Sequence, residues 1–294
     1  MVSLYYDLCA QDLPEFFEDN MRPWMEGFVV LLKYQNPALA ADDDDTEPSA
    51  VSLMQAEVVE GLSLLMSKEE EAFAPYLSGC LGEVWNVLMA TGLFPHQDML
   101  VTTAMRFLTT VSTSVHHQLF AAPEVLNNVC QRIISPNVQL LQADEELFEE
   151  NPFEYVRRDV EGSDSDTRRR GACDLVRGLC RNYEKQVTDL FSGDIGTLLQ
   201  QYAANPAANW KAKDAAIYLV IALTLKGSTS RLGATQTNAL VNLAPNVILA
   251  GTPLQQVHMQ FSLLGIERAY VTFGGRLQGI IRRSHLSSGG NGKA

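Results

Sequence analysis

The sequence predicts an all-α fold, arranged as a solenoid of paired helices, on three observations. Apolar residues recur at helical spacing in successive segments of ordinary helix length, and Gly, Pro, Asp or Asn separate these segments. Alternating apolar and polar runs bounded by tight turns are absent through residue 240, so no sheet is expected there. The helices come in pairs about every 40 residues, the period of a HEAT or armadillo-like array, although a single unrepeated helical domain remains an alternative.

The positions of the apolar stripes define the expected helices. They cover residues 13–32, 51–68, 73–91, 98–111, 123–141, about 166–180, 184–206 and 209–227. Pro23 lies inside the first stripe and is expected to kink or split that helix. Ser165 or Asp166 is expected to cap the helix that begins near residue 166. The last helix is almost uniformly apolar, which predicts a central place in the stack.

Three regions depart from the helical pattern and divide the chain. Residues 41–50 are an acidic linker, and the highly charged residues 144–166 are expected to be an insertion that forms a loop on one face of the array. The array itself is expected to span residues 1–243. Residues 244–294 are expected to be mostly irregular, with at best one short helix near Pro253–Arg268 and disorder after it.

The distribution of charge restricts the class of partner. The net charge is −13, which argues against nucleic acid as a main partner and favours a soluble protein with basic protein partners. Residues 1–165 hold 28 acidic and 7 basic side chains, a net of −21, whereas residues 166–294 hold 7 and 15, a net of +8. This asymmetry indicates either two electrostatic faces or a merely solvated acidic face.

The cysteines and the apolar runs indicate the compartment. The five cysteines are odd in number and lack disulfide or zinc spacing, so each is expected to be a buried small apolar residue in a reducing compartment. No signal peptide is evident, and apolar runs such as Ala215–Leu225 are shorter than a membrane span. The sequence therefore predicts a soluble intracellular protein without membrane insertion.

Motifs of enzymes are missing from the sequence. It contains no Walker loop, GxSxG or HExxH, and no Gly-rich turn follows a strand. His116 and His117 are adjacent, so on a helix they point in different directions and are interpreted as a polar surface pair rather than metal ligands. Asp42–Asp45 lacks the glycine and distal glutamate of an EF-hand loop and is interpreted as linker. We therefore expect no catalytic residue, cofactor or metal.

The stretch EGSDSDTRRR, residues 161–170, is where the charge of the chain changes sign. Arg168–Arg170 would stand in the first turn of a helix, where cations oppose the helix dipole unless an acidic group faces them. That group is either internal, with Asp164 and Asp166 as the nearby candidates, or a carboxylate of a partner. Ser163 and Ser165 lie among acids, a context that suits an acid-directed kinase but is common by chance.

Four long strings carry a resemblance to a known family. They are AQDLPEFFEDNM (Ala10–Met21), FEYVRRDVEGSD (Phe153–Asp164), DTRRRGACDLVRGLC (Asp166–Cys180) and NPAANWKAKDAAIYLV (Asn205–Val220). They resemble the exportin-2 (cellular apoptosis susceptibility protein) family of the importin-beta superfamily, from about Leu4 to Leu243. The resemblance implies central HEAT repeats of a right-handed superhelix. The family's chain is several times longer, and the residues after Leu243 do not resemble it.

The resemblance also implies a function and a surface. Family members bind Ran in its GTP form together with importin-alpha, export importin-alpha from the nucleus to the cytoplasm, and are not enzymes. The insertion would lie where the family contacts Ran, which makes the charged residues of that segment candidates for partner binding. They are Arg157, Arg158, Asp159, Glu161, Asp164, Arg168, Arg169 and Arg170. The alternative is a truncated or alternatively spliced helical scaffold without export activity.

Overall fold

A computed structural model of the chain describes residues 2–39, 47–159, 167–224, 247–249, 257, 268–273 and 276–282. The α-helices are α1 (Val2–Cys9), α2 (Glu15–Asp19), α3 (Met21–Lys33), α4 (Ala50–Lys68), α5 (Glu70–Ala90), α6 (Asp98–Thr113), α7 (Pro123–Asn128), α8 (Ser135–Val138), α9 (Gln142–Glu150), α10 (Pro152–Asp159), α11 (Arg168–Ala204) and α12 (Trp210–Thr224). Short 3₁₀ turns are η1 (Pro37–Leu39), η2 (Pro95–Gln97) and η3 (Val115–Phe120), and η4 (Val129–Ile134) is a π-helical turn.

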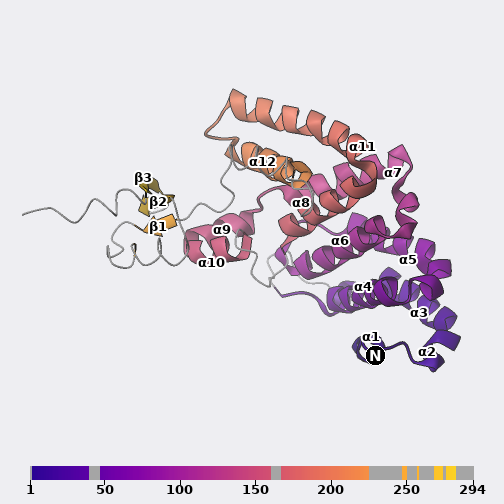
Figure 1. Cartoon of the computed structure of the whole chain (residues 1–294). Coiled ribbons are helices and arrows are strands. Elements are labelled where there is room, and N and C mark those ends of the chain that lie inside the picture. The colour runs from indigo at the N-terminus through magenta and orange to yellow at the C-terminus, as the bar shows by residue number, and fades with distance from the viewer. Residues whose placement is uncertain are drawn as a thin grey trace, which may run out of the picture.

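The helices form a stack with two layers. Figure 1 shows the stack rising from α1 and α2 (indigo) to α11 and α12 (orange). In one layer α1, α4, α6 and α11 pack side by side in this order, and α12 packs against α11. In the other layer α3 packs against α5, α5 contacts η4, and η4 packs against α11. The prediction of an all-α solenoid is therefore confirmed for the described part of residues 2–224.

Apolar stripes hold the layers together because α4, α6 and α11 bury theirs against the helices beside them. The core is continuous along the stack and includes Leu62 of α4, Phe107 of α6 and Leu179 of α11, all fully buried. Where α6 and α11 meet, Gly178 allows a close approach, since a Cβ atom there would lie 2.8 Å from Oγ of Ser112. The helix pairs are thus joined by packing rather than by loops.

One expected helix is divided in two, and two other expected helices follow each other directly in α11. The first is split at Asn20, and Pro23 is the third residue of α3, where its missing N–H removes no helical hydrogen bond. At Tyr183 the backbone of α11 leaves the helical region (φ −130°, ψ 31°), so α11 consists of two consecutive helices. They correspond to the helices expected at about residues 166–180 and 184–206.

The start of α11 and the insertion differ from expectation. Thr167 caps α11, because its hydroxyl oxygen accepts from the backbone N–H of Arg170 at 3.2 Å. The proposed caps, Ser165 and Asp166, lie outside the described residues. The expected insertion loop begins instead as the helices α9 and α10, whose rings Phe148 and Tyr155 meet edge to face.

The described part of the tail is a small sheet rather than irregular chain. Strands β1 (Val247–Leu249), β2 (Arg268–Phe273) and β3 (Arg276–Arg282) are ordered β1-β2-β3, with β1 parallel and β3 antiparallel to β2. The overlooked signal was two β-branched and aromatic runs separated by a Gly-Gly pair, which is typical of a hairpin. The disorder expected after Arg268 is wrong for residues 269–273 and 276–282, which lie in β2 and β3. Residues 283–294 and most of the short helix expected near Pro253–Arg268 lie outside the described residues.

One described helix, α4, is long and apolar enough to cross a membrane by length and composition. Core helices of folded domains pass the same test, and α4 packs between α1 and α6, against α3 and α5. Its fully buried residues include Val58, Val59 and Leu62. This property of α4 follows from its central place in the stack.

Candidate functional site

The three adjacent arginines at the start of α11 have different surroundings. The side chains of Arg168 and Arg169 are only 4% and 3% exposed, whereas Arg170 is exposed. Successive residues of a helix point about 100° apart, so three neighbours cannot all face the same environment. The first two face the interior of the stack and the third faces solvent.

Arg168 bridges the loop before α6 to α8. Its Nε donates to a carboxylate oxygen of Asp98 at 2.5 Å, and its two terminal nitrogens donate to the carbonyls of Gly92 and Phe94, each at 2.9 Å. A fourth bond reaches the amide oxygen of Asn137 at 3.3 Å. The guanidinium group therefore holds residues from three separate segments in one place.

Arg169 ties the insertion and α12 to the stack. It donates to a carboxylate oxygen of Asp214 in α12, to the Val138 carbonyl at 3.1 Å and to the Tyr155 hydroxyl of α10 at 3.3 Å. The Tyr218 ring of α12 lies under its guanidinium group, 3.7 Å from centroid to Cζ. Lys211 of α12 adds an ion pair to Glu145 of α9 at 2.8 Å.

These contacts correct the interpretation of Arg168 and Arg169 as direct partner-binding residues. Their burial contradicts it, because every donor that a partner's carboxylate would need lies inside the stack. The acidic partners that the structure describes are internal: they are Asp98 and Asp214, which lie 70 and 45 residues away in the sequence. The expected neighbours Asp164 and Asp166 lie outside the described residues.

The other candidate residues lie on or after α10. Arg157, Arg158 and Asp159 form the last turn of α10. Glu161 and Asp164 lie outside the described residues, as do Ser163 and Ser165. Because Arg169 bonds to Tyr155 of the same helix, the buried arginine positions the segment that carries these candidates.

A groove between α6 and α11 is lined by Arg170 and by three further arginines, which sequence reasoning missed. We call it the arginine groove: Arg106 of α6 and Arg170, Arg177 and Arg181 of α11, with Asp174 between them. It encloses about 360 Å³, and Figure 1 shows its two helices side by side. The available signal was the 4-3-4 spacing of residues 170, 174, 177 and 181, which places them on one helix face.

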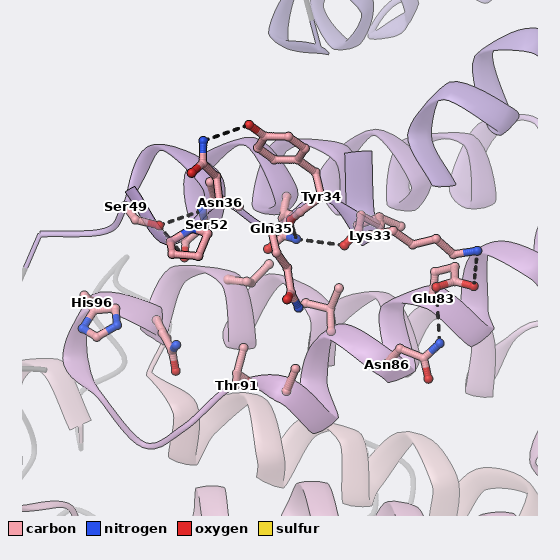
Figure 2. A pocket seen from close by; sticks show the side chains of 18 of the residues that line it. Lys33, Tyr34, Gln35, Asn36, Ser49, Ser52, Glu83, Asn86, Thr91 and His96 are labelled. Carbon is pink, nitrogen blue, oxygen red and sulfur yellow. Dashed lines mark hydrogen bonds and ion pairs between the residues drawn. The ribbon is translucent and has the colours of Figure 1, made fainter. Parts of the chain in front are cut away.

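Figure 2 shows a pocket of about 670 Å³ where the ends of α3 and α5 meet the start of α4. Lys33 pairs with Glu83 at 3.1 Å, and the buried Gln55 amide donates to the Leu32 and Tyr34 carbonyls. Much of the lining consists of amides and hydroxyls, which can hydrogen-bond to a peptide backbone. One wall is the loop that Arg168 holds through Gly92 and Phe94.

The histidines and cysteines have structural roles. His117 is half-buried and its Nδ1 lies 2.9 Å from the Tyr183 hydroxyl, which donates to the His117 carbonyl at 2.7 Å, so His117 is not a plain surface residue. His116 lies 3.8 Å from Glu70. Within the described ranges, no group of three or more His, Cys, Asp or Glu residues could hold a metal ion.

Four of the five cysteines are buried as expected, whereas Cys180 is half-buried. Burial raises the pKa of the Cys80 thiol to about 11 and that of Cys130 to about 12. Both groups therefore stay protonated near neutral pH, and a thiolate nucleophile is not available from them.

Comparison with known proteins gives consistent matches over the helical array. A family model described as Cse1 matches residues 1–251. Exportin-2 of Xenopus laevis is 48% identical over 244 residues, which are 83% of this chain and 25% of the relative. Exportin-2 of Homo sapiens is 48% identical over 241 residues, 82% of this chain and 25% of the relative.

A solved structure agrees with these relatives. The structure titled "The exportin Cse1 in its cargo-free, cytoplasmic state" superposes with a TM-score of 0.75 at 38% identity. The match covers 78% of this chain and 25% of that one. The chain thus spans about a quarter of the length of the proteins it matches.

Proposed function

The chain belongs to the Cse1 family of nuclear export receptors, and from this we propose that it forms part of a receptor for Ran in its GTP form and importin-alpha. Such a receptor would carry importin-alpha from the nucleus to the cytoplasm and would itself occur in both. The match to a Cse1 family model over residues 1–251 is the observation that carries this proposal.

The architecture supports a role in binding rather than chemistry. Repeats in a solenoid contact only their neighbours, so the array can flex and present separated surfaces to one large partner. Two partners that each order the same array offset part of the ordering cost for one another, which couples their affinities. A segment with few of these surfaces loses the multivalent gain, so we expect it to bind each partner weakly by itself.

We propose that the insertion contributes a contact to Ran through the charged residues that follow Tyr155. Arg157, Arg158 and Asp159 of α10, with Glu161 and Asp164, remain candidates for direct contact, and the exposed Arg170 lies beside them in the sequence. Arg168 and Arg169 are assigned a positioning role, because they hold α8, α10 and α12 together.

The test is binding by the chain at near-physiological salt, measured by biolayer interferometry. The ligands are Ran loaded with a non-hydrolysable GTP analogue, Ran loaded with GDP, and importin-alpha. We expect weak binding to the GTP form, which becomes stronger when importin-alpha is present. Double charge reversal, Arg157→Glu with Arg158→Glu, should weaken that binding, while Arg132→Glu with Arg22→Glu makes the same change of charge on exposed side chains elsewhere.

Equal binding to the GTP and GDP forms would contradict the proposal, as would no binding with all components present at high concentration. The second result would favour a helical scaffold without export activity. Tight binding to Ran alone would contradict the expected loss of multivalency.

A further inference from the structure

The arginine groove gathers four positive charges on a chain whose net charge is −13. Two carboxylates of the described residues pair with its guanidinium groups: Asp174 pairs with Arg177 at 2.6 Å, and Glu60 of α4 lies 3.5 Å from Arg106. No described acidic residue lies within ion-pair distance of Arg170 or Arg181, and both side chains are exposed.

The donors available in the groove belong to its arginines. Thr102, Thr109 and Thr113 of α6 also line the groove, but their hydroxyls donate to carbonyls of their own helix. The Nε atom of Arg177 is buried and has no hydrogen-bond partner. A buried donor without an acceptor is costly, so an acceptor that enters the groove would gain this bond.

The length of the groove sets the size of its ligand. Arg170 and Arg181 are separated by about 16 Å along α11, at about 1.5 Å per residue. An extended peptide rises about 3.3 Å per residue, so about five residues span this distance. A single phosphate or carboxylate could contact only one end of the row, whereas a short run of carboxylates could face all the arginines.

We propose that the arginine groove binds an extended acidic segment of a partner protein. Each guanidinium group presents a planar fork that matches a carboxylate, and charge-assisted bonds of this kind are stronger than neutral ones. A nucleic acid is disfavoured, because the whole chain has a net charge of −13 and repels a long polyanion. A short acidic segment contacts the groove without crossing the acidic surface. This inference rests on the groove alone and not on the proposed export function.

The test is fluorescence anisotropy with a labelled peptide of alternating Asp and Glu, about six residues long to match the row. The peptide should bind the whole chain at about 50 mM salt, and its affinity should fall at about 300 mM, because salt screens exposed charges. The double variant Arg170→Glu with Arg181→Glu should bind the peptide at least about tenfold more weakly, because two guanidinium groups are replaced by carboxylates that repel it. Circular dichroism checks that this variant, which changes exposed side chains, stays folded.

The matched control is Arg22→Glu with Arg132→Glu, which makes the same change of net charge on exposed arginines of the other layer. It should retain peptide binding within about twofold if the groove is the site. An equal loss in both double variants would overturn the proposal in favour of general attraction. No peptide binding at low salt, or tighter binding of a single-stranded oligonucleotide or a singly phosphorylated neutral peptide, would also overturn it.

Discussion

At the scale of single residues, buried charge is the most informative feature of this chain. Burying a guanidinium group removes several kcal/mol of hydration, which only good geometry and several hydrogen bonds can offset. Arg168 makes four such bonds, and Arg169 adds a tyrosine ring to three. Both residues therefore link, through hydrogen bonds, segments that are far apart in the sequence.

Replacing Arg168 with Met should destabilise the fold by about 3 kcal/mol, because Asp98 and two loop carbonyls lose their donor. Urea unfolding followed by circular dichroism measures this change. The matched variant Arg170→Met alters an exposed neighbour and should shift the free energy of unfolding by less than about 0.5 kcal/mol. A similar decrease in the free energy of unfolding in both variants would show that the hydrogen bonds of Arg168 do not stabilise the stack.

At the scale of elements, apolar periodicity located the helices well. The helices α3, α4, α6 and α12 were predicted from the spacing of their apolar residues, which is a local property of each segment. The helices α9 and α10 of the insertion were not predicted, because they have few apolar residues and contact the stack through polar side chains such as Tyr155. Tyr183, where α11 kinks, donates its hydroxyl hydrogen bond to the carbonyl of His117, a residue 66 positions away.

The start of α11 offers a test of capping. Thr167→Ala should lower the free energy of unfolding by about 1 kcal/mol, because the backbone N–H of Arg170 loses its acceptor. Thr167→Ser keeps that acceptor and should retain most of the stability. Ser165→Ala should leave the free energy of unfolding unchanged. A decrease equal to that of Thr167→Ala would show that Ser165 caps the helix. Thermal or urea unfolding of the three variants measures these differences.

At the scale of the whole molecule, the stack couples neighbours more strongly than distant repeats. α6 packs between α4 and α11, whereas α1 packs mainly on α4. Stability in such an array is approximately a sum over repeats and the contacts between neighbours. Opening should therefore begin where a helix has the fewest packed neighbours.

Hydrogen exchange measured by mass spectrometry should show this gradient, with α6 amides exchanging slowest and α1 amides much faster. Val111→Ala, a buried truncation in α6, should speed exchange in α4, α6 and α11 and change α1 least. Val115→Ala alters a side chain that is 73% exposed and should leave the pattern unchanged. Uniform exchange along the stack, or an equal response of α1 to both variants, would contradict coupling between neighbours.

The sequence by itself determined the helical class, the paired arrangement and the family, because helical spacing and long specific strings are local properties of the chain. The tertiary structure decided where the arginines point. Asp98 and Asp214 reach Arg168 and Arg169 only after α6 and α12 have packed beside α11, and no local pattern encodes that meeting. The same packing brings Arg106 opposite Arg177 and Arg181 and so creates the arginine groove. The sequence gives the number and order of the charged residues. Their burial and their partners are decided only when helices that are distant in the chain pack together.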